Sequence, residues 1–414
     1  MPTLQPVRGT QDLLPAEQSR HRRVIETARS ISARYGYQEI ATPIFEFTEV
    51  FSRPIGETTD IVVKEMYTFR DRSGDVITLR PEYTASICRA IISNGLTQSL
   101  PLKFFASGPM FRHERPQKGR FRQFHQIDVE LIGVPQPQAD VEVIEIGAEV
   151  LRELGILDRT VLELNTLGDT ASRRAYRDAL IDYFRRYQGE LSEDSQRRLE
   201  VNPLRILDSK DENDRRISAG VPSFDQYLND ESRKFFSEVR AGLDHLGIAY
   251  RLSPRLVRGL DYYCHTAFEF VTEHLGSQGT VLGGGRYDGL MALLGGPETP
   301  GVGWAAGIER LAMLTGEPSP PHRPVAVVPV GEQGEAAAPK IARDLRRAGF
   351  HVDLGYAGNV SRRMKRANKI HARVAVLIGE DELARAVATV RDLDGGNQSE
   401  VPLSELAERL APYR

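Results

Sequence analysis

Hydrophobic and polar positions follow two different periods in the first part of the chain. Apolar side chains recur at spacings of three and four in three segments, residues 17–35, 84–94 and 140–154. This spacing predicts amphipathic helices, and Gly36 and Gly95 stand where a glycine commonly ends a helix. Residues 37–47 are instead extended in character and are broken by Pro43, as expected of a strand at a sheet edge.

Two other segments predict pairs of antiparallel strands. MYTFRDRSGDVITLRPE, residues 66–82, has two strand-like runs on either side of the turn signal Arg72-Ser73-Gly74. Residues 102–114 and 121–133 have the pattern of two longer strands, joined by a loop that contains PQKG. The first part of the chain therefore mixes helices with antiparallel strands.

The composition changes at about residue 168 and changes back at about residue 247. Two amphipathic helices are predicted there, with the polar stretch LDSKDENDRR between them, and we interpret residues 168–247 as a helical insertion. Strand-like segments return in LVRGLDYYCHTAFEFV and GVGWAAGIERLAML. Between those two segments, GTVLGGGRYDGL has the composition of a glycine-rich turn.

The tail has a different organisation. A proline-rich linker, residues 316–324, is followed by strand-like runs that alternate with helical patterns. This alternation predicts a small α/β domain with a mostly parallel sheet. The expected domains are therefore residues 1–318, which include the insertion, and residues 325–414.

Composition narrows the function classes. The chain has 414 residues, with 57 acidic and 54 basic side chains, so it has no bulk attraction to nucleic acid or membrane. Cys88 and Cys264 stand outside any CxxC pattern, which excludes a disulfide framework or a cysteine-based zinc site and fits a reducing compartment. The N-terminus lacks an apolar signal segment, and the apolar runs are too short to span a bilayer. We expect a cytoplasmic protein.

The predicted hairpin at residues 102–133 has an unusual local charge. Five basic residues lie in its loop region, with three phenylalanines between them: Arg112, Arg115, Lys118, Arg120 and Arg122, and Phe111, Phe121 and Phe124. Guanidinium groups present paired donors that match phosphate oxygens, and a phenylalanine offers a flat face to a base. The alternative is a solvated basic hairpin, which charge alone favours. The chain has no GxxxxGK[ST] phosphate loop, so ATP would bind on another scaffold.

Seven motifs together resemble one family. FRHERPQKGRFRQFHQ and GVGWAAGIERL resemble motifs 2 and 3 of class II aminoacyl-tRNA synthetases. LVRGLDYYCHTAFEF and GGGRYDGL resemble the two signature peptides of histidyl-tRNA synthetases, and RGTQDLLP, GETTDIVVKEMYTF and TLRPEYTA match that family as well. The motifs run in family order from residue 8 to residue 311, and the tail resembles the family's anticodon-binding domain.

The resemblance implies an α+β catalytic domain whose mainly antiparallel sheet is flanked by helices, with a helical insertion and a C-terminal α/β anticodon-binding domain. It implies ATP-dependent ligation of L-histidine to the 3′ end of tRNA(His) through a histidyl-adenylate, with Mg²⁺ entering with ATP. It also implies a homodimer, since YGYQEIATPIFEF resembles the interface-forming motif 1. The implied partners are tRNA(His), ATP and L-histidine, with no membrane.

The same resemblance assigns roles to individual residues. Arg112 and Arg258 would be catalytic, as cations beside the reacting carboxylate and α-phosphate. ATP would be bound by five residues, Arg112, Glu114, Arg120, Phe124 and Arg310. Histidine would be bound by Glu82, Tyr83, Thr84, Arg112, Gln126, Glu130, Arg258, Tyr262, Tyr263 and Tyr287. No protein metal-ligand set is implied. Tyr83 stands where a small residue is more usual, which would narrow the pocket mouth.

Each assignment has a structural alternative. Glu82, Glu130 and Arg258 could form an ion-pair set without catalysis, and the tyrosines could be core residues of a strand. In the tail, Arg362, Arg366 and Lys369 lie at helical spacing and suit the phosphates of tRNA, but a solvated helix face fits that spacing equally well.

One rival function is the regulatory subunit of ATP phosphoribosyltransferase, a catalytically silent relative of the synthetases. That family usually lacks the C-terminal domain and loses parts of the RGLDYY region. This chain has both features, so the synthetase is the favoured function.

Overall fold

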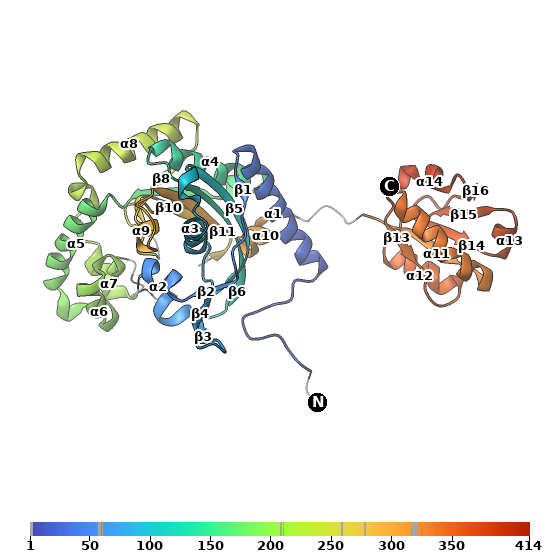
Figure 1. Cartoon of the computed structure of the whole chain (residues 1–414), viewed down its shortest axis with the longest axis horizontal. Helices are drawn as coiled ribbons and strands as arrows, with labels where there is room; N and C mark the ends of the chain where they lie inside the picture. Colours follow the sequence, from blue (N-terminus) through green and yellow to red (C-terminus); the bar gives the residue numbers. More distant parts are fainter. Residues whose placement is uncertain are drawn as a thin grey trace. The chain divides into compact units, whose positions relative to one another are not determined.

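The computed structural model describes residues 3–56, 59, 61–207, 209, 211–257, 260–276, 279–316 and 322–414. The chain divides into two compact units, Met1–Pro318 and Ser319–Arg414, each with its own sheet (Figure 1). Residues 317–321 of the predicted linker lie outside the described residues. Among the helices described, none combines the length and the apolar composition needed to cross a membrane.

An eight-stranded sheet is the centre of the first unit. Its strands, in spatial order, are β1 (Gln38–Glu39), β5 (Leu102–Phe111), β6 (Gln123–Ile132), β11 (Gly301–Gly307), β10 (Thr280–Arg286), β9 (Cys264–Val271), β7 (Val161–Thr166) and β8 (Arg251–Leu252). Neighbours are antiparallel except at the two edges, where β1 pairs with β5 and β7 pairs with β8 in parallel. The predicted mainly antiparallel sheet, including the β5–β6 hairpin, is confirmed.

Strand β10 corrects one prediction. GTVLGGGRYDGL was expected to form a glycine-rich turn, but Thr280–Arg286 is a central strand between β9 and β11. The glycines are needed because neighbouring backbones approach closely: a Cβ at Gly284 would overlap the carbonyl oxygen of Gly303 and lie 2.6 Å from the Cβ of Trp304. Composition alone does not distinguish this use of glycine from a turn.

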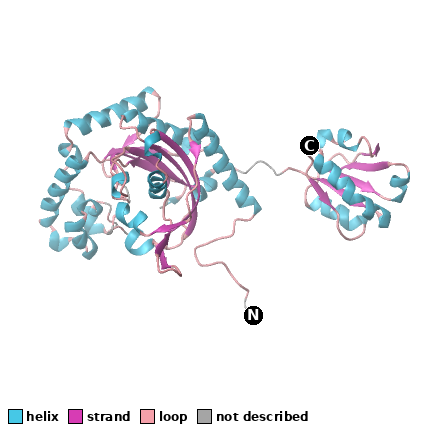
Figure 2. Cartoon of the chain, in the orientation of Figure 1, coloured by secondary structure: helices cyan, strands magenta, loops and turns pink. Residues whose placement is uncertain are grey.

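Helices pack around the central sheet, as Figure 2 shows. One core contains α1 (Pro15–Arg34), α4 (Pro137–Glu153) and α10 (Ile308–Leu314), with the buried Trp304 of β11, whose Nε1 donates to the carbonyl of Val143 at 2.9 Å. A second core contains α2 (Glu49–Ile55), α3 (Thr84–Ser93) and α9 (Leu290–Leu293), with Phe51, Ile87 and Met110. Two hydrophobic cores therefore hold the sheet between layers of helices.

A separate three-stranded sheet has the order β2 (Phe45–Phe47), β4 (Val76–Leu79) and β3 (Tyr67–Arg70). The pairing of β3 with β4 confirms the hairpin predicted from the turn signal. The buried side of this sheet is polar, since Glu46 and Thr78 are almost fully buried, whereas Phe45 and Phe47 are 54% and 56% exposed. This is the reverse of the alternation expected for a sheet that faces water.

Four α-helices occupy the described residues of the segment interpreted as an insertion. They are α5 (Thr170–Arg185), α6 (Glu193–Val201), α7 (Glu212–Ser218) and α8 (Asp230–His245). Each begins at a side chain that accepts a hydrogen bond from a backbone N–H of its first turn: Asp169, Ser192, Asp211 and Asn229. Their own core contains Tyr176, Leu180 and Phe184. Helices α6 and α7 were not predicted, because their sequences are polar.

The second unit has a five-stranded sheet in the order β13 (Val352–Leu354), β12 (Val325–Pro329), β14 (Val374–Ile378), β15 (Val387–Asp392) and β16 (Gln398–Pro402). It carries α11 (Gly331–Arg347), α12 (Val360–Lys369), α13 (Glu380–Ala384) and α14 (Leu406–Arg409). The predicted mostly parallel sheet is wrong in one half: β14, β15 and β16 are antiparallel. The short turn after β15, where Asp392 accepts the N–H groups of Asp394 and Gly395, permits only an antiparallel return.

Candidate active site

A cavity of about 360 Å³ opens in the first unit beside β6, β10 and β11. Ten of the residues assigned to histidine or ATP line it: Glu82, Thr84, Arg112, Glu114, Arg120, Phe124, Gln126, Tyr262, Tyr263 and Arg310. They come from segments far apart in the sequence, namely the start of α3, the β5–β6 hairpin, the loop before β9 and α10. The fold therefore brings the predicted motifs together around one space.

Arg112 lies at the end of β5, where the backbone and the side chain are both held. Its backbone N–H donates to the carbonyl of Arg122 at 2.9 Å, and its Nε donates to the carbonyl of Pro81 at 2.9 Å. Its guanidinium carbon is 5.3 Å from the ring centroid of Phe124 on β6. The guanidinium is thus oriented by the segment that continues into Glu82.

Three guanidinium groups gather at one end of the cavity. Arg310 donates to the carbonyls of Gly119 and Thr280 at 3.1 and 2.7 Å. Burial, followed by the charges of Arg120 and Arg112, lowers the pKa of Arg310. Arg120 makes an ion pair with Glu114. An anion bound here would offset the repulsion between these cations, so this end of the cavity suits a phosphate-rich ligand.

Two buried carboxyls mark the other end of the cavity: Glu82 lines it, and Glu130 lies behind the lining residue Thr84. Glu130 is buried, with one carboxylate oxygen 2.6 Å from the donating hydroxyl of Thr84 and the other accepting from the hydroxyl of Tyr287. Glu82 accepts the backbone N–H of Ala85 at 2.9 Å, and burial raises the pKa of its carboxyl. Buried carboxyls held by hydrogen bonds suit a ligand that brings a positive charge or several N–H donors.

Not every assigned residue lines the cavity. Glu130 and Tyr287 lie directly behind Thr84, and the Tyr287 ring is 5.9 Å from that of Tyr262. Tyr83 is 1% exposed; its hydroxyl donates to the carbonyl of Ser107 at 3.1 Å, and the guanidinium of Arg80 lies 4.1 Å from its ring. The expected narrowing of the pocket mouth by Tyr83 was therefore wrong, because the ring packs against β5. Arg258 lies outside the described residues.

Two residues that sequence reasoning missed belong to this region. Asp128 is 1% exposed, and within the described part of the chain neither of its carboxylate oxygens has a hydrogen-bond partner. Burial, together with Glu130 and Glu82, raises the pKa of this carboxyl. Because Gln126, Asp128 and Glu130 alternate along β6, they share one face, and that alternation was the signal that could have found Asp128.

The second missed residue, Glu309, anchors the hairpin to α10. Both of its carboxylate oxygens accept the backbone N–H of His125 at 3.0 Å, and one lies 2.8 Å from Nδ1 of the same histidine. His21, His125 and Glu309 have potential metal-ligand atoms within 4.8 Å of one another. The His125–Glu309 hydrogen bond accounts for the closeness of that pair. Glu309 lies in GVGWAAGIERL beside the assigned Arg310, and that motif was the signal that could have found it.

In the second unit, the predicted basic face of α12 is divided. Arg362 and Lys369 are exposed, and the Arg362 N–H is capped by Asn359 at 3.0 Å. Arg366 is also exposed but makes two hydrogen bonds with Asp353 of β13, at 3.0 and 2.8 Å. A phosphate that approaches Arg366 would compete with this carboxylate.

Replacing Glu130 by glutamine should change how stability depends on pH. Burial raises the pKa of Glu130 from 4.5 to about 8. Below pH 4.5 both the folded and the unfolded chain hold this proton, so the contribution to stability is full. As the pH rises from there towards about 8, the unfolded chain releases the proton first and the folded state loses free energy relative to it.

We therefore expect Glu130→Gln to lose less stability than the wild type over that pH range. Urea unfolding followed by the fluorescence of Trp304, the single tryptophan, reports on the first unit. The exposed Glu298→Gln is the control, since an exposed acid should leave the pH dependence unchanged. Parallel pH profiles for Glu130→Gln and the wild type would contradict the expectation.

Comparison with known proteins identifies the family of the chain. Residues 9–311 match the family model described as Histidyl-tRNA synthetase, and residues 324–412 match the one described as Anticodon binding domain. Histidine–tRNA ligases of Rhodospirillum rubrum and Gluconacetobacter diazotrophicus are each 57% identical to this chain, the first over 100% of both chains and the second over 99% of both.

Solved structures agree with these sequence matches. The crystal structure of apo histidyl-tRNA synthetase from S. aureus has a TM-score of 0.83 and 35% sequence identity, and covers 98% of this chain and 99% of its own. Full-length similarity to proteins of this name favours the synthetase over the regulatory-subunit alternative, and it confirms the resemblance seen in the motifs. The chain belongs to the histidyl-tRNA synthetase family.

Proposed function

We propose that this protein ligates L-histidine to the 3′ end of tRNA(His), with ATP as the energy source and a histidyl-adenylate as the intermediate. The observation that carries the proposal is the division of one cavity into an end lined by the cations Arg112, Arg120 and Arg310 and an end lined by the buried carboxyl of Glu82. The reaction needs such a pairing, since it joins a polyanionic nucleotide to an amino acid that carries an α-ammonium group. Catalysis then consists mainly of placing the two reactants and stabilising charge at phosphorus.

At the cationic end, Arg112 would contact both the α-phosphate and the histidine carboxylate. The carboxylate oxygen attacks the α-phosphorus in line, and pyrophosphate leaves with the electrons of the broken P–O bond. Arg120 would bind the outer phosphates once ATP displaces Glu114, which would then approach the adenine. Phe124 and Arg310 would hold the purine between them, because a guanidinium stacks favourably on a π face.

At the acidic end, the α-ammonium group of histidine would bind Glu82, Thr84 and Gln126. Glu130 and Tyr263 would bracket the imidazole, with Tyr262 and Tyr287 completing the wall. Both nitrogens of a neutral imidazole can be hydrogen-bonded at once, one as donor and one as acceptor. A buried site that satisfies both would reject apolar amino acids of similar size, because its own polar groups would be left unpaired.

The second step transfers the histidyl group to tRNA. A ribose hydroxyl at the tRNA 3′ end attacks the adenylate carbonyl, and AMP leaves with the bonding electrons. Arg258 would stand beside the reacting carboxylate and α-phosphate as a second catalytic cation. Mg²⁺ would enter bound to the phosphates of ATP, as part of that substrate.

The remaining assignments give catalysis and anticodon binding to different domains. Residues 1–318 would carry the catalysis, with residues 168–247 as its helical insertion, and residues 325–414 would bind the anticodon region in the cytoplasm. The exposed cations Arg362 and Lys369 would face tRNA phosphates, and Arg366 would join them once released from Asp353. Contacts of this kind weaken as the salt concentration rises.

Pyrophosphate–ATP exchange with each standard amino acid tests the main proposal. This assay measures only the adenylate step. Among the amino acids tested, histidine alone is expected to support exchange. A folded protein that exchanges with no amino acid would overturn the proposal and would favour the regulatory alternative. Exchange with a different amino acid would overturn the assignment of the acidic pocket.

The three-stranded sheet supports a homodimer. Phe45, Leu79 and Tyr67 form one cross-strand row, and Phe47, Ile77 and Phe69 form the next, on a single face. Three phenylalanines of this face are about half exposed: Phe45 54%, Phe47 56% and Phe69 47%. Exposed apolar patches with a polar inner face mark interaction sites. We infer that a second copy of the chain covers this face, in the region that resembles motif 1.

Phe47→Glu should weaken that dimer by about 30-fold or more in Kd, because it places a charge at the centre of a desolvated face. Sedimentation velocity over a concentration series measures the change. Leu246→Glu, at an apolar position that is 45% exposed on another surface, is the matched control and should leave Kd unchanged. A wild-type chain that stays monomeric at all concentrations would rule out the homodimer.

A further inference from the structure

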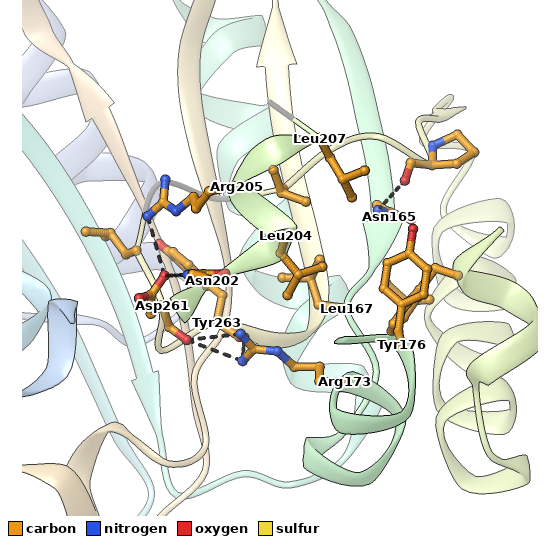
Figure 3. A pocket seen from close by; sticks show the side chains of 15 residues that line it. Asn165, Leu167, Arg173, Tyr176, Asn202, Leu204, Arg205, Leu207, Asp261 and Tyr263 are labelled. Carbon is orange, nitrogen blue, oxygen red and sulfur yellow. Dashed lines mark hydrogen bonds and ion pairs between the residues drawn. The ribbon is translucent and has the colours of Figure 1, made fainter. Parts of the chain in front are cut away.

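The loop before β9 separates two cavities. Leu260, Tyr262 and Tyr263 line the large cavity of the candidate active site. On its other side, Leu260, Asp261 and Tyr263 line a second cavity of about 40 Å³, whose remaining wall includes residues of the insertion (Figure 3). Leu260 and Tyr263 therefore form part of both walls, so whatever holds the loop on the insertion side also sets the shape of the candidate active site.

One arginine of the insertion holds the backbone of this loop. Nη1 of Arg173, on α5, donates to the carbonyl of Tyr263 at 2.5 Å and to that of Asp261 at 3.3 Å, and its Nη2 reaches the Asp261 carbonyl at 3.3 Å. Figure 3 shows the guanidinium pointing at the loop from the insertion. The two carbonyls flank Tyr262, whose hydroxyl lies 3.4 Å from Glu82 in the acidic pocket.

The side chain of Asp261 is held from the same direction. Its Oδ1 accepts Nδ2 of Asn202 at 3.0 Å and lies 3.5 Å from the guanidinium of Arg205, on η5 (Pro203–Ile206). On the opposite side, a Cβ at Gly56 would overlap Oδ2 of Asp261. The loop is therefore fixed through its backbone by α5, through its side chain by the segment after α6, and by close packing against Gly56.

We propose that the insertion acts as a clamp on the amino-acid pocket, with Arg173 and Asn202 as positioning residues that set Tyr262 and Tyr263. Neither residue would touch histidine. A shift of α5 removes the donor from the carbonyls of Asp261 and Tyr263, and a shift of η5 removes the donors from the Asp261 side chain. Either shift lets Tyr262 move away from Glu82. The inference rests on the proposed function, since it assigns the insertion control over binding of the amino acid rather than of ATP.

A clamp and a merely structural contact make different predictions. If Arg173 only supports the fold, its loss should lower the stability and should affect both substrates alike. If it positions Tyr262 and Tyr263, its loss should weaken histidine binding selectively, because the cationic end of the cavity is built on the β5–β6 hairpin and α10, away from this loop. The split between KM for histidine and KM for ATP is therefore the decisive readout.

The experiment compares Arg173→Met with Arg177→Met in histidine-dependent pyrophosphate exchange. Arg177 is one turn along α5 and donates to the carbonyl of Glu200 at 2.7 Å, within the insertion, so it is the matched control. For Arg173→Met we expect KM for histidine to rise about tenfold while KM for ATP stays within about twofold. Arg173→Lys, which retains a donor, should recover part of the loss.

A second variant keeps the test decisive if Arg173→Met folds poorly. Asn202→Ala removes only the hydrogen bond to Asp261 and should raise KM for histidine about threefold, without a change in KM for ATP. The clamp would be overturned if KM for histidine in Arg173→Met and in Asn202→Ala stayed within about twofold of its value in Arg177→Met. It would also be overturned if KM for histidine and KM for ATP rose by the same factor. Failure of the proposed function would instead appear in the wild type, as an absence of histidine-dependent exchange.

Discussion

Replacing Arg112 by alanine will lower kcat for histidine-dependent pyrophosphate exchange by about 10²–10³-fold, the usual effect of removing one pre-positioned donor from a developing charge. Arg112 is oriented before any ligand binds, by the Pro81 carbonyl at 2.9 Å and by Phe124. Its loss removes the one described cation that we place against both the α-phosphate and the carboxylate. The rate of exchange at saturating histidine and ATP measures the effect.

Two variants control this result. Arg112→Lys retains the charge but not the planar pair of donors, so it should recover only part of kcat. Arg115→Ala removes an exposed cation from the same loop and should leave kcat within about twofold of the wild type. An Arg112→Ala protein that loses no more activity than Arg115→Ala would remove Arg112 from the catalytic site.

Asp140→Ala will destabilise the first unit by about 3–5 kcal/mol, the typical cost of breaking a buried ion pair. Arg286 and Asp140 both have side chains that are 0% exposed, and Arg286 also donates to the carbonyl of Val134 at 3.1 Å. We choose Asp140 because its loss leaves a buried guanidinium that cannot release its proton. Removing Arg286 would cost less, since burial raises the pKa of the Asp140 carboxyl and favours its neutral form.

Urea unfolding followed by Trp304 fluorescence measures this loss in the unit concerned. Glu149→Ala on the same helix breaks an exposed pair with Arg152 and should cost at most about 1 kcal/mol. The double variant Asp140→Leu with Arg286→Met should return to within about 1–2 kcal/mol of the wild type, because it leaves no buried charge unpaired; Asp288, which also loses its ion pair with Arg286, is 37% exposed. Equal losses for Asp140→Ala and Glu149→Ala would show that the buried pair is not what stabilises this region.

The fate of Arg286 illustrates why local sequence was a poor guide at some positions. GGGRYDG has the composition of a loop that approaches a ligand, yet its arginine is fully buried and its first three glycines belong to a central strand. Glycine serves a turn and a close backbone approach equally well, and only the neighbouring strands distinguish them. Local sequence was equally uninformative for Tyr83, because the position of its ring depends on its packing against β5.

Periodicity and turn residues by themselves determined the helices at residues 15–34, 84–93 and 137–153 and both hairpins, because these depend on neighbours a few residues apart. The motifs determined the family, because their residue types match in order over the whole chain. Only the tertiary structure decided the order of the strands, the two antiparallel pairs in the second unit and the burial of Asp128. It alone placed Arg173 of the insertion against the carbonyl of Tyr263, 90 residues away. Contacts across such separations depend on how complete elements pack, and no short stretch of sequence carries that information.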